Sequence, residues 1–361
     1  MGAILLLEDG RKFTGDAFGA VTTKVGEAVF NTAMSGYQEV LSDPSYAEQV
    51  VAMTAPHIGN TGVNLEDPES ERVWPAAFVV RSLTRAPSSW RSRGGLNQYL
   101  AQHGVPGMQG LDTRALVRHL RSRGAMKCVV STDGTSEDDL RKRLEAWPGM
   151  TGRDLASEVS CSAPYVYADP AEARLRIAVI DGGVKQNILR LLAQAGCYVR
   201  VHPLHDPAST IMEGVDAVLV SNGPGDPAAI PGVVEELKTI MGQRPLVGIC
   251  LGNQLLGLAL GATTYKLKFG HRGANQPVKD LRTGKIEITS QNHGFAVDEA
   301  SLIAVGAEVT HRHLNDQTVS GFWHPAKRVF AVQYHPEACP GPRDSESILL
   351  EQFIRFARED A

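Results

Sequence analysis

Short apolar runs alternate with helical patterns between residues 176 and 261, and this alternation limits the fold of the 361-residue chain more than any other feature. The strand-like runs cover 176–180, 197–201, 217–220 and 246–249, and the helical patterns cover 185–195, 233–241 and 254–261. Buried strands that alternate with helices indicate a parallel, doubly wound sheet with helices on both faces. We therefore expect an α/β fold here, with any binding crevice at the carboxyl ends of the strands.

The first part of the chain has a different pattern, in which short strands are mixed with isolated helices. The expected strands are 3–7, 50–54, 77–80 and 127–131, and the expected helix is 113–123. The first run leads into a Glu-Asp-Gly turn and is typical of an edge strand. We expect a separate, mixed α+β domain over 1–155, a Ser- and Pro-containing linker over 156–174, and the doubly wound domain over 175–361.

Composition excludes several classes of function. A formal net charge of -4 with both signs interspersed provides no basic stripe for nucleic acid, and no apolar stretch is long enough to predict a membrane span. The 5 cysteines are scattered without metal-ligand spacing, so we expect neither a disulfide framework nor a metal site. The N-terminus lacks the pattern of a secretory signal. These features favour a cytoplasmic protein.

Cys250 is the candidate nucleophile. It follows the apolar run 246–249, it precedes a helical pattern, and Gly248 and Gly252 flank it. A side chain on a tight strand-to-helix turn projects clear of the sheet, and flanking glycines let the backbone bend without Cβ clashes. The helix N-terminus favours a thiolate. The alternative is that Cys250 is a small buried hydrophobic residue, as most free cysteines are.

His335 and Glu337 are the candidate partners of this cysteine. They follow a strand-like run near the end of the chain, and Pro336 between them fixes the backbone so that both side chains leave on the same side. A carboxylate placed in this way can orient an imidazole, which completes a Cys-His-Glu triad.

A glycine-rich turn, Asn222-Gly-Pro-Gly225, follows the strand 217–220 and should reach the same edge of the sheet. Bare amides at Gly223 and Gly225 could stabilise the oxyanion of a tetrahedral intermediate, although an isolated turn of this kind can be merely a tight connection. No phosphate-binding glycine motif occurs in a strand-to-helix setting, so no nucleotide site is expected.

Three motifs together resemble the class I, triad-type glutamine amidotransferases: Gly248-Ile-Cys-Leu-Gly-Asn-Gln254, Asn222-Gly-Pro-Gly-Asp-Pro227 and His335-Pro-Glu337. The segments 30–46, 56–60, 291–297 and 340–342 look like those of the small subunits of carbamoyl phosphate synthetases, and this resemblance spans essentially the whole chain. The triad alone is shared with GMP synthetase, CTP synthetase and anthranilate synthase.

The resemblance implies a role for each matching residue. Cys250 would attack the glutamine amide, His335 would relay protons, Glu337 would orient His335, and the Leu251 and Gly252 amides would be candidates for the oxyanion hole. The residues that would hold L-glutamine are Ser45, Gly223, Gly225, Leu251, Gln254, Asn292, Gly294 and Phe295. His293 would lie near the pocket, where a structural hydrogen-bonding role is at least as reasonable as catalysis.

The same resemblance implies a division of labour between two chains. Glutamine would be hydrolysed here, and ammonia would pass to a large subunit that uses bicarbonate, ATP and Mg in the supply of pyrimidine and arginine synthesis. We expect no cofactor in this chain, and a heterodimer that can assemble further. The alternatives are the glutaminase part of another synthetase, and a catalytically silent docking or regulatory module.

Four positions depart from the pattern of the family. Asn253 stands where histidine is frequent, Gly182 where an aromatic residue is common, and Cys339 and Arg343 replace the more usual serine and histidine. None of these changes removes a triad member. Asn253 removes a possible second base beside the thiol, and Cys339 is close enough in sequence to be oxidised with Cys250, although simple packing is the alternative.

Overall fold

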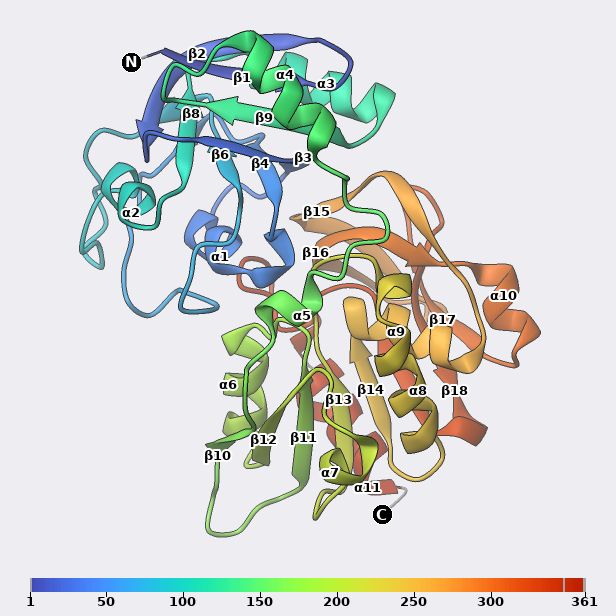
Figure 1. Ribbon diagram of the computed structural model, residues 1–361. Helices are drawn as coiled ribbons and strands as arrows, with labels where there is room; N and C mark the ends of the chain where they lie inside the picture. Colours follow the sequence, from blue (N-terminus) through green and yellow to red (C-terminus); the bar gives the residue numbers. More distant parts are fainter. Residues whose placement is uncertain (1, 347, 360–361) are drawn as a thin grey trace. The chain divides into compact units, whose positions relative to one another are not determined.

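The chain folds into two compact units in a computed structural model that describes residues 2–346 and 348–359 (Figure 1). The first unit comprises Met1–Thr151 together with the short segment Lys268–Gly273, and the second comprises Gly152–Leu267 and Ala274–Ala361. No helix in the described part of the chain is both long and apolar enough to cross a membrane.

A closed barrel forms the core of the first unit, with the strand order β1-β2-β8-β6-β4-β3-β9. The strands are β1 (Gly2–Leu7), β2 (Lys12–Gly19), β3 (Thr23–Asn31), β4 (Gln49–Met53), β6 (Ala77–Val79), β8 (Pro106–Gln109) and β9 (Met126–Ser131). Leu5 pairs with Phe13 of β2 and with Val130 of β9. The prediction that the first run is an edge strand is therefore wrong, because closure gives it a neighbour on both sides.

The remaining elements of the first unit surround this barrel. They are α1 (Tyr37–Ser42), η1 (Pro44–Tyr46), β5 (His57–Ile58), β7 (Ser82–Leu83), α2 (Leu96–Gln102), α3 (Thr113–Arg123) and α4 (Glu137–Ala146). Helix α3 has the predicted bounds, and Asp112 caps it by accepting a hydrogen bond of 2.9 Å from the Ala115 amide. In the segment Lys268–Gly273, the buried Arg272 donates from Nε to Gln49 Oε1 at 3.0 Å. Nothing in the sequence pattern predicted that this segment joins the first unit.

A ten-stranded sheet organises the second unit, in the order β10-β12-β11-β13-β14-β19-β18-β17-β15-β16. Its parallel part runs through β12 (Tyr198–Pro203), β11 (Arg176–Asp181), β13 (Ala217–Val220), β14 (Leu246–Ile249) and β19 (Val329–Val332). The α/β class and the doubly wound arrangement are confirmed. Antiparallel strands extend the sheet: β15 (Thr264–Asp280), β16 (Ile286–Val297), β17 (Glu308–His313) and β18 (Val319–His324).

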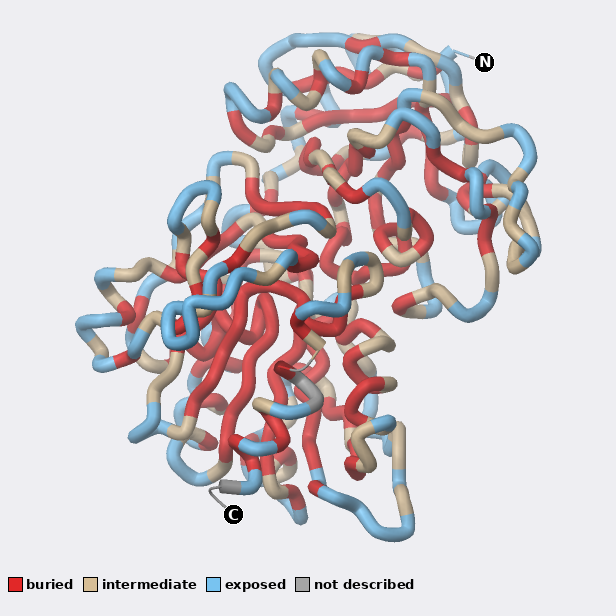
Figure 2. The backbone as a smooth tube through the Cα atoms, turned by 180° about the vertical axis from the view of Figure 1, so that it is seen from behind, coloured by how far each residue is buried: buried red, intermediate tan, exposed pale blue. Residues whose placement is uncertain are grey.

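Helices cover both faces of this sheet because neighbouring side chains of each strand point in opposite directions. Leu246 packs in the apolar cluster that contains α8 (Pro231–Ile240) and α9 (Leu251–Leu260). Val247 packs in the opposite cluster, which contains α6 (Gln186–Gln194) and α11 (Ile354–Glu359). The central strands are consequently buried along their length (Figure 2).

The stretch 156–174, which its serines and prolines predicted to be a linker, contains regular secondary structure. It contains α5 (Ala156–Val159) and β10 (Tyr165–Ala168), and Tyr165 of β10 pairs with Val201 of β12. This short strand, Tyr-Val-Tyr-Ala, is the edge of the sheet, so it pairs on one side only and stays exposed or half-buried. The other elements are α7 (Ala208–Ile211), η2 (Pro227–Ala229), α10 (Glu299–Ala304), η3 (Pro325–Lys327) and η4 (Ile348–Phe353).

Candidate active site

Cys250 occupies the turn between β14 and α9 and has a strained backbone, with φ 55° and ψ -100°. Such a conformation is unfavourable for a residue with a Cβ and is typical of functional sites. The Cys250 amide donates to Val332 O of β19 at 2.9 Å, which ties the turn to the strand that leads to His335. The thiol is buried, and its Sγ lies 3.5 Å from Asn292 O. The helix begins at Leu251, earlier than the predicted 254.

Gly248 and Gly252 flank Cys250 for a reason different from the predicted one. The positive φ falls on Cys250, and neither glycine is among the residues with this conformation. The absence of a Cβ at these two positions lets neighbouring backbone segments approach each other closely. A Cβ on Gly252 would lie 2.1 Å from Val220 O, and one on Gly248 would lie 2.6 Å from the Gly252 backbone. Both glycines therefore let α9 begin against β13 and β14.

His335 and Glu337 meet beyond the end of β19. His335 Nδ1 lies 2.7 Å from Glu337 Oε1, and both residues are buried. The His335 amide donates to Ser290 O at 2.8 Å, which fixes the imidazole beside β16. In the described part of the chain, His335 Nε2 has no hydrogen-bond partner. This nitrogen is therefore available to exchange a proton with a substrate.

The charges of His335 and Glu337 each shift the pKa of the other residue so that both charged forms are favoured. Burial alone would lower the pKa of His335, but the negative charges of Glu337 and Cys250 outweigh it and raise that pKa to about 10. Burial would raise the pKa of Glu337, but the cationic Lys185 and His335 lower it to about 2. At neutral pH the site therefore holds an imidazolium beside the carboxylate of Glu337.

Lys185 is a site residue that sequence reasoning missed. Its side chain is 3% exposed, its Nζ lies 3.0 Å from Glu337 Oε1, and it also donates to Ala338 O. Asn187 supports the same turn by donating to Glu337 O. The available signal was position, because Lys185 follows the Asp-Gly-Gly turn at the carboxyl end of β11. Without the fold, a lysine at the start of a helical pattern is indistinguishable from a surface residue.

The turn Asn222-Gly-Pro-Gly225 lies beside this lysine, at the predicted edge of the sheet. Asn222 Oδ1 accepts from the Lys185 amide at 3.2 Å, and Asn222 Nδ2 donates to Gly183 O at 2.9 Å. A Cβ on Gly223 would lie 1.9 Å from Gly182 O, so only glycine fits there. Gly182, which stands where the family commonly has an aromatic residue, thus lies against Gly223. Gly225 has a positive φ of 93° and packs against residues 153–155.

The two amides proposed for the oxyanion hole differ in availability. The Gly252 amide donates to Ser221 O at 3.0 Å, so it is already engaged, and the structure argues against its predicted role. Leu251 is the first residue of α9, where an amide has no acceptor within the helix. Leu251 therefore remains the better donor on this side of the site.

Gln254 is held by two hydrogen bonds from the same nitrogen. Its Nε2 donates to Phe295 O at 2.8 Å and to Gln333 Oε1 at 3.2 Å. Asn253 Nδ2 shares this acceptor, at 3.2 Å from Gln333 Oε1. All three amide side chains are buried. Asn253 therefore joins a network that positions Gln254. Gln333 is a further residue that the sequence reasoning did not identify.

The segment 291–295 of β16 brings its predicted residues to the same place. The backbone carbonyl of Asn292 faces the Cys250 thiol, and the backbone carbonyl of Phe295 accepts a hydrogen bond from Gln254 Nε2. His293 contacts Phe295 O through Nδ1 at 2.7 Å and Gln291 Oε1 through Nε2 at 3.0 Å. These contacts give His293 a structural role. Gly294 lies between these residues and is half-buried.

The remaining candidates lie in other settings. Ser45 belongs to the first unit, where it is buried in η1 and its amide donates to Asp43 Oδ1 at 2.9 Å, so its role in binding glutamine stays a prediction. Cys339 is half-buried, and neither it nor any other cysteine forms a disulfide. Arg343 is 82% exposed and pairs with Glu346 on the surface.

Comparison with known proteins agrees with this geometry in both halves of the chain. Residues 5–130 match the CPSase domain of the carbamoyl-phosphate synthase small chain, and residues 178–355 match glutamine amidotransferase class-I. A carbamoyl phosphate synthase small chain from Syntrophotalea carbinolica is 49% identical over 99% of this chain and 97% of its own length. The chain belongs to the carbamoyl phosphate synthase small chain family. It is therefore a small chain with a glutamine amidotransferase domain.

Other relatives of this chain include a protein from a bacterium and a chloroplastic protein from a plant. A small chain from Nitratidesulfovibrio vulgaris is 50% identical over 99% of this chain and 97% of its own length. A chloroplastic small chain from Oryza sativa is 44% identical over 99% of this chain and 82% of its own length. Both matches cover the two units, so they distinguish this family from other proteins that share the amidotransferase domain alone.

Proposed function

We propose that this small chain hydrolyses L-glutamine through a glutamyl thioester on Cys250 and passes the ammonia to a large synthetase subunit. The observation that carries the proposal is the buried charge row formed by His335, Glu337 and Lys185, with the Cys250 thiol beside the imidazolium. Such a row supplies both a nucleophile and a proton donor at neutral pH.

The first half of the reaction uses the imidazolium as an acid. The Cys250 thiolate attacks the side-chain amide carbon, and the negative charge that develops on the amide oxygen is stabilised by the Leu251 and Gly223 amides. His335 Nε2 then donates its proton to the leaving nitrogen. The C–N bond breaks, ammonia leaves, and a glutamyl thioester and a neutral imidazole remain.

The second half uses the same imidazole as a base. A water molecule attacks the thioester carbon while His335 Nε2 takes one of its protons. The C–S bond then breaks and regenerates the thiolate beside an imidazolium, and the released acid loses its proton to become glutamate. Glu337 holds the ring in orientation throughout, through the 2.7 Å contact to Nδ1.

The binding of the glutamine head group follows from which atoms remain available. The Gln254 amide nitrogen is engaged by Phe295 O and Gln333 Oε1, so its Oε1 is the atom that can accept a hydrogen bond from the substrate ammonium. Backbone groups of Gly225, Gly294 and Phe295 can recognise the head group without side-chain bulk. Asn292 and Ser45 complete the proposed set.

The partner and the setting belong to the same proposal. ATP and Mg would bind to the large subunit, with which this chain would form a heterodimer or a higher assembly of heterodimers. The cytoplasm is the proposed location, because five cysteines that form no disulfide suit a reducing environment.

Cys250→Ser tests this function in the assembled enzyme. We expect glutamine-dependent carbamoyl phosphate synthesis to be abolished and synthesis from added ammonia to be retained. The matched control is Cys197→Ala, which alters another buried, free cysteine of the same unit. It should leave both activities intact. Glutamine hydrolysis that persists in Cys250→Ser would refute the mechanism.

The two rival functions make different predictions. A silent docking module would show no covalent labelling of Cys250 by a glutamine-analogue electrophile, whereas the proposed glutaminase would be labelled stoichiometrically. The glutaminase part of another synthetase would support amidation of that enzyme's acceptor and not carbamoyl phosphate synthesis. The match of residues 5–130 to the CPSase domain favours the proposal over this second rival.

A further inference from the structure

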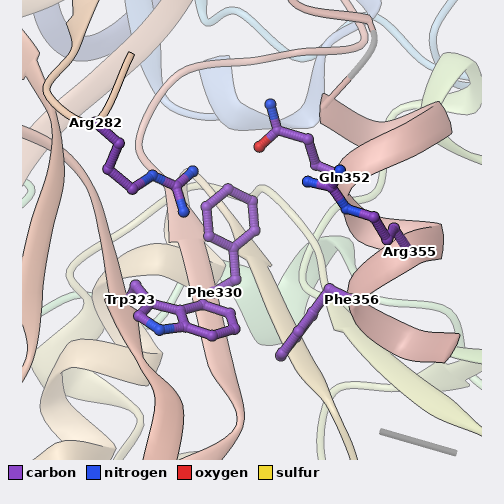
Figure 3. Close-up of a pocket in the computed structure, with 6 residues that line it drawn as sticks. All are labelled: Arg282, Trp323, Phe330, Gln352, Arg355 and Phe356. Carbon is purple, nitrogen blue, oxygen red and sulfur yellow. The ribbon is translucent and has the colours of Figure 1, made fainter. Parts of the chain in front are cut away.

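A pocket of about 180 Å³ lies in the second unit and has no part in the chemistry described above (Figure 3). Its lining comes from strands β18 and β19, from the turn that joins β15 to β16, and from the C-terminal helical segment. The lining residues are Arg282, Trp323, Phe330, Gln352, Arg355 and Phe356. None of the residues proposed for glutamine hydrolysis or binding is among them.

Three aromatic rings form the apolar part of this pocket. Trp323 and Phe356 meet edge to face with their centroids 4.8 Å apart, and Trp323 and Phe330 lie 6.4 Å apart. Phe330 and Phe356 are buried and Trp323 is half-buried, so the rings are fixed by the core and present a rigid surface. A flat ring can stack on such a surface or meet it edge to face.

Two guanidinium groups give the pocket its charge. Arg282 and Arg355 reach toward the Phe330 ring from opposite sides, and Gln352 lies beside Arg355 (Figure 3). None of the six lining residues is acidic. Arg282 also faces the carboxylate of Asp280, whose Oδ1 lies 3.8 Å from Nε, at the long limit of an ion pair. Arginine presents a planar fork that matches a carboxylate, and it stacks well on aromatic rings.

The volume limits what the pocket can hold. At about 30 Å³ for each water in the liquid, 180 Å³ corresponds to roughly six waters. This space is below the range of about 300–1,000 Å³ for drug-sized ligands. A single ring with one charged substituent matches this size.

We propose that this pocket binds a small planar anion, namely an aromatic or heteroaromatic ring that bears a carboxylate. The ring packs against Trp323, Phe330 and Phe356, and the carboxylate lies between Arg282 and Arg355. The ligand would contact β19 five residues before His335, on the face of the sheet covered by α11. The site is separate from the glutamine site.

Calorimetric titration of the full chain with three probes tests the proposal. Benzoate has the ring and the charge, benzamide has the same shape without the charge, and inorganic phosphate has charge without a ring. We expect benzoate to bind at least tenfold more tightly than either of the other two. Equal affinity for benzoate and benzamide, or for benzoate and phosphate, would overturn the assignment.

Substitutions locate the binding within the chain. Arg282→Gln and Arg355→Gln should each weaken benzoate binding at least fivefold, and Trp323→Leu should weaken it by removing the stacking surface. The matched control is Arg174→Gln, at an exposed arginine of the same unit that does not line the pocket, which should bind benzoate like the parent chain. Indistinguishable affinities in Arg282→Gln, Arg355→Gln and Arg174→Gln would overturn the proposal.

Two further readouts separate this proposal from others. Glutamine hydrolysis should be unchanged in Arg282→Gln and Arg355→Gln, so a failure of this site would not bear on the glutaminase. A short peptide that ends in Phe-Glu serves as the macromolecular competitor. If it bound to the parent chain while benzoate did not, the pocket would belong to an acidic protein segment and the small-anion assignment would be wrong.

Discussion

Replacement of Lys185 by methionine should reveal how much the buried charge row stabilises the second unit. Lys185 and Glu337 are 3% and 0% exposed, and Nζ lies 3.0 Å from Oε1. Methionine keeps most of the apolar stem of lysine and removes the cation, so Glu337 stays buried with His335 as its remaining counter-charge.

The magnitude follows from the pKa of Glu337. Burial opposes ionisation, but Lys185 and His335 together hold the pKa at about 2 instead of the ordinary 4.5. At about 1.36 kcal/mol for each pH unit, that net lowering, which the two cations achieve against the effect of burial, corresponds to roughly 3 kcal/mol. Removing one partner of a buried pair costs about 3–5 kcal/mol. We therefore expect Lys185→Met to lose about 3 kcal/mol of unfolding free energy at pH 7.

The pH dependence has a definite sign. Because the folded pKa of Glu337 lies below its unfolded value, the stabilisation is present above about pH 4.5 and is lost as the pH falls toward 2. The difference between the parent chain and Lys185→Met should therefore shrink with acidification. Urea unfolding of the full chain, followed at several pH values, measures it.

Lys238→Met is the matched control within the same unit. Lys238 Nζ is closer to its partner, at 2.7 Å from Glu235 Oε1, but the two side chains are 46% and 69% exposed. An exposed pair of this kind contributes about 0.2–1 kcal/mol. Glutaminase turnover should fall at least tenfold in Lys185→Met and stay unchanged in Lys238→Met. Equal losses of stability in the two variants, with normal turnover in both, would refute the reasoning.

Two further predictions concern the triad and its turn. In ¹³C-histidine spectra of the full chain, the His335 signal should titrate near pH 10. Glu337→Gln should lower the pKa of His335 because a negative charge is lost. An unchanged pKa in this variant would show that Glu337 does not stabilise the imidazolium. Gly252→Ala would place a Cβ 2.1 Å from Val220 O, so it should destabilise the chain by about 1–3 kcal/mol or more in urea unfolding. Gly232→Ala, at an α8 position with nothing within 4 Å of the added carbon, should be neutral or stabilising, and similar effects at both sites would contradict the crowding argument.

Much of the site could be predicted because it depends on local sequence. The turn at Cys250 requires glycines two residues before and after it, and the order of strand, turn and helix is readable from apolar periodicity. His335 and Glu337 are two residues apart, so their contact of 2.7 Å needs only a turn. Lys185 and Gln333 escaped prediction because their partners, Glu337 and Gln254, are remote in sequence.

The sequence by itself determined the doubly wound sheet and the placement of Cys250, His335 and the glycine turn at the ends of its strands. It also determined that the chain belongs with the triad-type amidotransferases. Each of these conclusions depends on periodicity or on a short motif. Only the tertiary structure decided that β1 closes a barrel and that residues 156–168 contribute a helix and a strand. It also decided that the Gly252 amide donates a hydrogen bond to Ser221 O. It also decided that Lys185 completes the charge row. The physical reason is that barrel closure, amide pairing and buried charges depend on partners that no local pattern specifies.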